Sequence, residues 1–184
     1  MTKSMDNNEQ QVISEVLSGE VESYRFLVER YLNGLVSHLC NLIGDKDVAE
    51  DLTQDAFLKA YQKLGQYKSQ YAFSTWLYAI ADNLAYKQMK RSKRFTAFDE
   101  VEEFLPDITD STEDRLDRQQ QRLKIRQAVQ KLDPHYRQVI SLYYWDNLSY
   151  EEIALILKRP IGTIRTWLRR SKVQLREELY EQTR

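Results

Sequence analysis

The chain has few of the residues that break or cross-link a polypeptide. Its 184 residues include one cysteine, five glycines and three prolines. A single cysteine, Cys40, excludes an internal disulfide, and its apolar helical surroundings predict a buried, unreactive thiol. Long runs without glycine or proline favour helices over a turn-rich β protein. No apolar run approaches the ~18 residues that cross a bilayer, and residues 1–11 are polar, unlike a secretory signal. We therefore expect a cytoplasmic protein without membrane insertion.

The sequence also has few features of an enzyme. Its only two histidines, His38 and His135, lie in different halves of the chain. There is no glycine-rich phosphate loop, and no cluster of ligand residues at metal-binding spacing. We therefore expect no catalytic residues, no metal and no cofactor, and we interpret the chain as a protein that is not an enzyme.

Charge is segregated along the chain, although the formal net charge is only −1. Residues 87–94 and 158–176 carry several lysines and arginines and no acid, whereas residues 99–117 are heavily acidic. A phosphate backbone responds to the local field within a Debye length of about 10 Å. Two basic blocks therefore favour nucleic-acid binding, with solvated helix faces as the alternative for either block.

Apolar residues at three- and four-residue spacing predict an all-α protein. The predicted helices cover residues 8–18, 20–43, 47–64, 75–93, 114–132, 134–145, 150–157 and 161–180. Acids, serine, threonine and a proline between two helical groups predict a flexible acidic linker. We expect two small helical domains. The expected division is an N-terminal extension at 1–20, a first domain at 21–94, a linker at 95–118 and a second domain at 119–184.

Capping residues predict where several helices begin. Asp47 with Glu50 predicts the start of the third helix, and Ser74 can cap the fourth. Ser149 with Glu152 forms the pattern of a capping box. The third helix is expected to bury its apolar residues at helical spacing: Val48, Leu52, Ala56, Ala60 and Leu64.

Residues 149–176 have the layout of a helix-turn-helix. A short capped helix leads through a tight turn to a longer helix with one apolar face. The opposite face carries hydroxyl and basic side chains, which suit a major groove and its phosphates: Thr163, Arg165, Thr166, Arg169, Arg170 and Lys172. The pattern predicts binding to duplex DNA. An αα-hairpin with a basic surface is the alternative.

A dense aromatic segment, residues 71–78, runs into the first basic block. Rings that stack on bases, followed by cations, suit single-stranded DNA. Asn83 adds a donor and an acceptor able to read an unpaired base edge. The candidate residues for this contact are Phe73, Trp76, Asn83, Lys87, Lys90 and Arg91. The alternative is that the apolar members of the segment belong to the core.

These motifs resemble a known family. Region 2 of extracytoplasmic-function (ECF) sigma factors, in the sigma-70 family, is similar to three segments: 47–61 (DVAEDLTQDAFLKAY), 73–78 (FSTWLY) and 80–83 (IADN). Region 4 of the same family is similar to three others: 132–140 (LDPHYRQVI), 148–154 (LSYEEIA) and 161–166 (IGTIRT). The two halves occur in the family's order over about residues 21–179, so the joint pattern is specific.

The resemblance implies a transcription-initiation factor that gives core RNA polymerase its promoter specificity. The helix at 47–64 resembles the one that docks on the clamp helices of the largest subunit. Its candidate contacts are Asp51, Gln54, Asp55 and Lys59, although some of these could merely cap or solvate the helix. Region 4 would meet the flap of the second-largest subunit. The aromatic segment resembles the reader of the unwound −10 element, and the last helix resembles the reader of the −35 duplex.

The resemblance further implies that the acidic linker runs toward the polymerase active-site and RNA-exit channels, and that an anti-sigma protein can act as a partner. Trp167 and Lys87 depart from the family pattern and leave the promoter sequence open. Two other readings stay open from the residues. One is a stand-alone helix-turn-helix regulator whose first half binds a ligand or dimerises, and the other is an enzyme, which the missing motifs disfavour.

Overall fold

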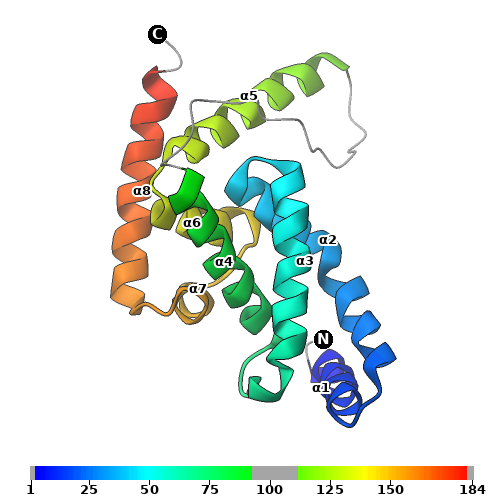
Figure 1. The fold of residues 1–184 in the computed structure, drawn as a ribbon. Coiled ribbons are helices and arrows are strands. Elements are labelled where there is room, and N and C mark those ends of the chain that lie inside the picture. The colour runs from blue at the N-terminus through cyan, green and yellow to red at the C-terminus, as the bar shows by residue number, and fades with distance from the viewer. Residues whose placement is uncertain (1–2, 93–111, 182–184) are drawn as a thin grey trace.

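The computed structural model describes residues 3–92 and 112–181, and this part of the chain is helical without strands (Figure 1). The elements in order are α1 (Lys3–Leu17), η1 (Val21–Ser23), α2 (Tyr24–Ile43), α3 (Lys46–Gln62), η2 (Leu64–Gln66), α4 (Phe73–Ser92), α5 (Thr112–Lys131), α6 (Pro134–Ile140), η3 (Ser141–Trp145), α7 (Tyr150–Leu157) and α8 (Ile161–Glu181). The all-α prediction is confirmed. None of the described helices combines the length and apolarity that a bilayer crossing needs.

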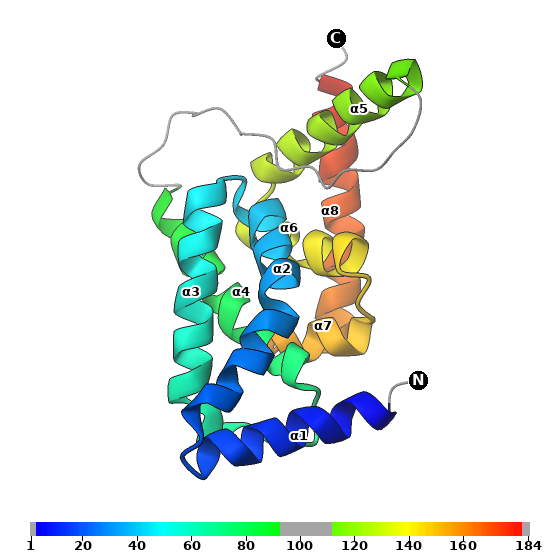
Figure 2. The same ribbon diagram turned by 90° about the vertical axis from the view of Figure 1, so that its right-hand side faces the viewer.

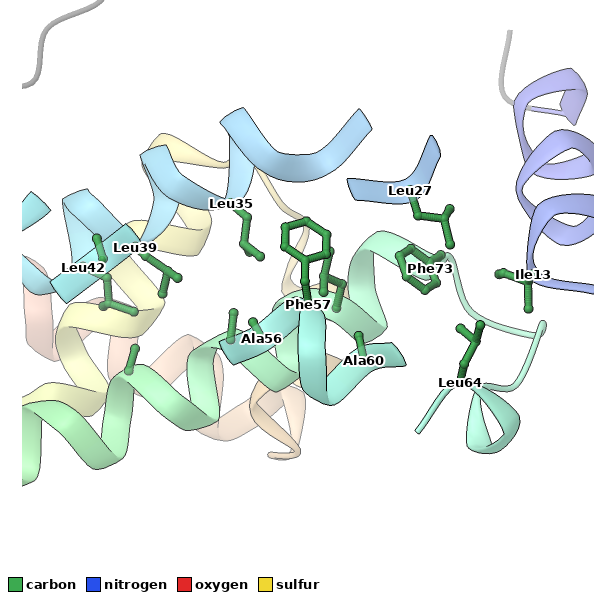
Figure 3. Packing of buried hydrophobic residues seen from close by; sticks show 14 of the residues in the cluster. Ile13, Leu27, Leu35, Leu39, Leu42, Ala56, Phe57, Ala60, Leu64 and Phe73 are labelled. Carbon is green, nitrogen blue, oxygen red and sulfur yellow. The ribbon is translucent and has the colours of Figure 1, made fainter. Parts of the chain in front are cut away.

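The first hydrophobic core lies among α1, α2, α3 and α4. Leucines of α2 at helical spacing, Leu27, Leu35, Leu39 and Leu42, are fully buried. Figure 3 shows them along one side of the cluster, with residues of α3, α4 and η2 completing it. α1 also contributes Val12, Ile13 and Val16 to this cluster, so part of the expected extension is packed into the first core.

The second core lies among α5, α6, η3, α7 and α8. Its fully buried side chains include Leu142, Ile153 and Ile164. Two residues of α4, Tyr78 and Ala79, pack against this second cluster. α4 contacts α2 and α3 on one side and α6 and α7 on the other, as both ribbon views show (Figures 1 and 2). The helix that carries the first basic block therefore lies between the two cores.

The start of α3 differs from the sequence prediction. Asp45, not Asp47, is the N-cap, and its Oδ1 accepts a hydrogen bond from the Val48 backbone N–H at 3.0 Å. The buried face is also displaced. Its members are Ala49, Thr53, Ala56, Phe57 and Ala60, whereas Val48 and Leu52 are half-buried. The reason is that α3 packs against both α2 and α4, and small alanines admit both neighbours.

Ser74, predicted to cap the fourth helix, lies inside α4, which begins at Phe73. Other local predictions agree with the structure more closely. The capping box is present: the Glu152 N–H donates to Ser149 Oγ at 3.2 Å, and the Ser149 N–H donates to Glu152 Oε2 at 2.9 Å. The helix expected at 134–145 is α6 followed by the π-helical η3. The expected linker lies outside the described residues up to residue 111, and residues 112–118 are helical because they begin α5. Cys40, predicted to be buried, is only half-buried, and burial raises the pKa of its thiol.

Candidate nucleic-acid and polymerase interfaces

The outer face of α8 carries most of the predicted duplex-binding residues. Five of the six are exposed: Arg165, Thr166, Arg169, Arg170 and Lys172. Thr163 is half-buried. Ile164 and Leu168 on the opposite face are buried in the second core. The helix is therefore fixed by its apolar face and presents its cations outward, as a major-groove helix requires.

Tyrosines of η3 and of the start of α7 lie near these cations. The Arg165 guanidinium lies 5.9 Å from the Tyr150 ring centroid. The Lys172 ammonium lies 5.8 Å from the Tyr143 ring and 5.5 Å from the Tyr144 ring. A hydrogen bond with Tyr144 raises the pKa of Lys172. The sequence analysis missed these tyrosines, although their clustering just before the helix-turn-helix was a visible signal.

Trp167, the departure from the family pattern, faces the second core. Its ring is half-buried, with the His135 ring centroid 4.8 Å away. The Arg159 guanidinium lies 5.9 Å from the same ring. Trp167 thus anchors the base of α8 and holds a cation of the turn, and it does not belong to the exposed face that carries Arg165 and Arg169.

The residues predicted to bind single-stranded DNA divide into two groups. Asn83, Lys87, Lys90 and Arg91 are exposed along α4. In the second group Trp76 is half-buried, and Phe73 is fully buried.

The ring of Phe73 lies 5.7 Å, between centroids, from each of the rings of Tyr31, Tyr67 and Trp76. In this conformation Phe73 has no exposed surface for a base, and its ring packs against that of Trp76. Asn83 Nδ2 donates to the Ala79 carbonyl at 2.6 Å, so its amide is engaged by its own helix.

The predicted polymerase contacts lie on one side of α3. Asp51, Gln54 and Asp55 are exposed, and Lys59 is half-buried with its Nζ 4.0 Å from Asp55 Oδ2. Leu58 follows Asp51, Gln54 and Asp55 by seven, four and three residues, which places it on the same face, and it is 55% exposed. The prediction missed Leu58 because its candidate contacts on this helix were all polar side chains. The face is an apolar centre with an acidic rim, a composition typical of protein interfaces.

A buried polar network joins the two cores. His38 of α2 lies between two carboxylates: its Nδ1 is 2.6 Å from Asp146 Oδ2 and its Nε2 is 3.2 Å from Asp82 Oδ2. Gln138 Nε2 of α6 donates to Asp82 Oδ1 at 2.9 Å. Burial lowers the pKa of His38, but the charges of Asp82 and Asp146 outweigh that and raise it to about 10. We call His38, Asp82, Gln138 and Asp146 the domain seam.

A cavity of about 330 Å³ opens beside the domain seam. Its lining residues include Tyr31 and Ser37 of α2, Tyr78 of α4, Trp145 of η3 and Asp146 directly after η3. Burial, then the charges of Asp146 and Asp82, raise the pKa of Tyr78.

Comparison with known proteins matches both halves of the chain. Residues 27–95 match the family "Sigma-70 region 2", and residues 122–175 match "Sigma-70, region 4". The RNA polymerase sigma-H factor of Pseudomonas aeruginosa is 32% identical over 174 residues, covering 89% of this chain and 90% of the relative. The ECF RNA polymerase sigma-E factor of Escherichia coli K12 has the same identity and coverage. The ECF sigma factor SigW of Bacillus subtilis is 30% identical, covering 91% and 94%.

Solved structures of similar fold include two complexes. The structure of CnrH with the cytosolic domain of CnrY gives a TM-score of 0.68 at 20% identity, covering 95% of this chain and 98% of that one. The sigma factor RpoE of Bartonella quintana with the anti-sigma factor NepR gives 0.67 at 26% identity, covering 86% and 98%.

The two domains and their order are those of sigma-70 proteins, the class that directs promoter-specific transcription initiation with RNA polymerase. Within that class the chain belongs to the ECF sigma factors, because relatives of that name match it over nine-tenths of its length. Proteins of this family are initiation factors rather than enzymes, and the resemblance stated from the motifs is confirmed.

Proposed function

We propose that this sigma factor reads the −35 element as duplex with α8 and the −10 element as an unwound strand with α4. The exposed basic face of α8, opposite the buried Ile164 and Leu168, is the observation that carries the proposal. The first domain would then be residues 21–94 and the second residues 119–184. α3 would dock on the clamp helices of the largest polymerase subunit, and the second domain would meet the flap of the second-largest.

The energetics make polymerase a necessary partner. Opening about ten base-pair steps costs on the order of 14 kcal/mol at about 1.4 kcal/mol a step. One or two bases stacked on aromatic side chains return about 2–6 kcal/mol. Trp76, which is half-buried, is the aromatic side chain of the candidate set with surface left for such a base. The factor alone therefore does not melt a promoter, and polymerase contacts supply the remainder.

The reading helix is tested by removing one arginine at a time. Each bidentate arginine–guanine pair discriminates by about 1–3 kcal/mol, so Arg165→Ala or Arg169→Ala should weaken −35 duplex binding about 5- to 150-fold. Arg122→Ala is the matched control, because Arg122 is exposed on α5 outside the helix-turn-helix. A variant that loses only a phosphate contact should instead bind all sequences more weakly by the same factor. The slope of log affinity against log salt concentration should then fall by about one.

Fluorescence anisotropy on matched and scrambled duplexes measures both effects. Affinity and sequence preference that stay at the wild-type value in both α8 variants would remove α8 as the −35 reader.

The strand-binding surface is tested at Asn83 and Trp76. Asn83→Ala and Trp76→Ala should reduce permanganate-reactive open complexes, while closed complexes form as before, because each side chain acts only on unpaired bases. Gln127→Ala, an exposed amide on α5, is the control. Closed-complex loss equal to open-complex loss would contradict the assignment to single-stranded DNA.

The α3 face is tested at its apolar centre. Leu58→Asp should lower the affinity for core polymerase by tenfold or more, since an interface centre tolerates an added charge poorly. Ile125→Asp is the matched control, because Ile125 is 42% exposed on α5. Equal effects of the two changes would refute α3 as the docking helix. We also propose an anti-sigma partner, which the anti-sigma complex of the similarly folded Bartonella protein supports.

A further inference from the structure

The domain seam holds a charged histidine between the two domains. Both ring nitrogens of His38 lie against carboxylate oxygens, which accept hydrogen bonds and cannot donate them when ionised. Both nitrogens must therefore donate, and His38 is an imidazolium. His38 and Asp82 are each 1% exposed, and the side chain of Asp146 is 13% exposed at the edge of the cavity. One charged pair belongs to region 2, and region 4 brings the second carboxylate.

A second set of contacts joins the domains at the end of α2. Gln130 Nε2 donates to the Asn41 carbonyl at 2.8 Å, and Arg137 Nη1 donates to the Leu42 carbonyl at 3.3 Å. The last carbonyls of a helix have no partner within the helix, so these side chains of region 4 satisfy acceptors of region 2. The domains thus meet through polar contacts from the middle of α2 to its end.

This arrangement cannot span a promoter under the function proposed above. The −35 and −10 elements are about 25 base pairs apart, which is about 85 Å of duplex at about 3.4 Å per base pair. A compact chain of this length has a radius of gyration of about 16 Å and a diameter of about 40 Å. The two domains must separate before α8 and α4 can read both elements, and the domain seam must break.

We propose that His38, Asp82 and Asp146 form a latch that holds regions 2 and 4 in a closed, promoter-incompetent state. The latch is built to open. On separation Asp146 and Gln138 leave with region 4, while the His38–Asp82 pair stays together in region 2 and gains access to water. Breaking an internal ion pair is costly when it leaves a buried charge without a partner, and this separation leaves none. The observed contacts therefore describe one of two stable states.

The groups around His38 define how the latch responds to pH. α4 presents Asp82 and the Tyr78 phenol, whose ring centroid is 5.0 Å from that of the imidazole. Asp146 faces it from the end of η3, and α6 presents the neutral Gln138 to Asp82. Two carboxylates thus oppose one cation, and loss of the imidazolium proton leaves them to repel each other. The closed state binds that proton more tightly than the open state, so rising pH favours opening.

The latch is tested on the full chain by removing the carboxylate that region 4 supplies. Asp146→Ala should raise the radius of gyration from about 16 Å to above about 20 Å in small-angle X-ray scattering. It should also speed assembly of promoter-competent holoenzyme by about fivefold or more. The reason is that only the open fraction of the population can assemble, and the variant raises that fraction. Glu22→Ala, an exposed carboxylate on η1 outside α3 and α8, is the control with no expected change.

A second variant guards against a folding defect. Gln138→Glu places a carboxylate against Asp82 and should open the latch in the same way, with circular dichroism confirming that the helices are retained. A wild-type radius in both folded variants would overturn the latch. A larger radius without faster assembly would overturn its inhibitory role.

Binding to an isolated −35 duplex separates the latch from the function on which it rests. That binding needs α8 alone, so it should be equal in wild type and both latch variants. Its absence from all three proteins would refute the proposed function, whereas its presence with an unchanged radius would refute only the latch.

Discussion

Replacing Phe73 by leucine separates a core role for this ring from a base-stacking role. The side chain is 0% exposed and touches three aromatic rings. A change of shape at a packed position costs up to about 1.5 kcal/mol, and each of the three lost ring pairs about 0.5–1.5 kcal/mol, so we expect a loss of about 2–6 kcal/mol. For a chain of this size the thermal midpoint should fall by roughly 4–24 °C.

Two measurements on the same protein give the answer. Thermal unfolding by circular dichroism reports the core, and permanganate footprinting with polymerase, below the midpoint, reports strand opening. We expect Phe73→Leu to lower the midpoint and keep open complexes. Trp76→Leu also loses ring contacts, to Phe73 and Tyr67, and lowers the midpoint, but it should lose open complexes as well because Trp76 is only half-buried. An unchanged midpoint with lost opening in Phe73→Leu would show that this ring contacts a base, and the argument from burial would fail.

Three further changes test local features. Ser149→Ala removes one half of the capping box and should cost about 1 kcal/mol, seen as a midpoint lower by about 2–4 °C, with no shift refuting the cap. Gly44→Ala should cost about 1–2 kcal/mol in urea unfolding, because φ is +84° and the new Cβ would lie 2.8 Å from Gln130 Cδ, whereas Gly162→Ala, with open space around it, should not destabilise. The pKa of His38 is raised to about 10 with both carboxylates in place, and it falls when Asp146 leaves with region 4, so the contribution of the imidazolium to domain contact is lost as pH rises toward 10. The radius of gyration should therefore grow as pH approaches 10, and a constant radius would contradict the sign.

Local signals in the sequence predicted local structure well. The capping box at Ser149 and the helix-turn-helix after it depend on residues three to four positions apart, and both are present as expected. The N-cap of α3 was predicted at Asp47 instead of Asp45. Either aspartate could cap the helix by its residue type, and only the backbone geometry selects Asp45. Phe73 illustrates the same limit, since an aromatic ring at helical spacing reads alike whether it packs inward or faces a base.

The domain seam was beyond sequence reasoning for a different reason. His38 bonds partners 44 and 108 residues away, Asp82 and Asp146, so no periodicity connects them. In the sequence alone, His38 argues only against an enzyme. Its position in an otherwise leucine-rich helix face was a signal, because an ionisable group there needs partners from elsewhere in the fold.

The end of α2 gives the two-domain arrangement a built-in reporter. The carbonyls of Asn41 and Leu42, in the last turn of α2, accept hydrogen bonds from region 4. When the domains separate, these carbonyls are exposed to water. The Gln130 amide and Arg137 guanidinium protons donate to those carbonyls, so their exchange with solvent, followed by NMR, tracks how much of the population is parted. Because that turn leads directly into α3, the same reading would also register whatever binds that helix, and the two signals could be told apart by adding DNA and protein in separate steps.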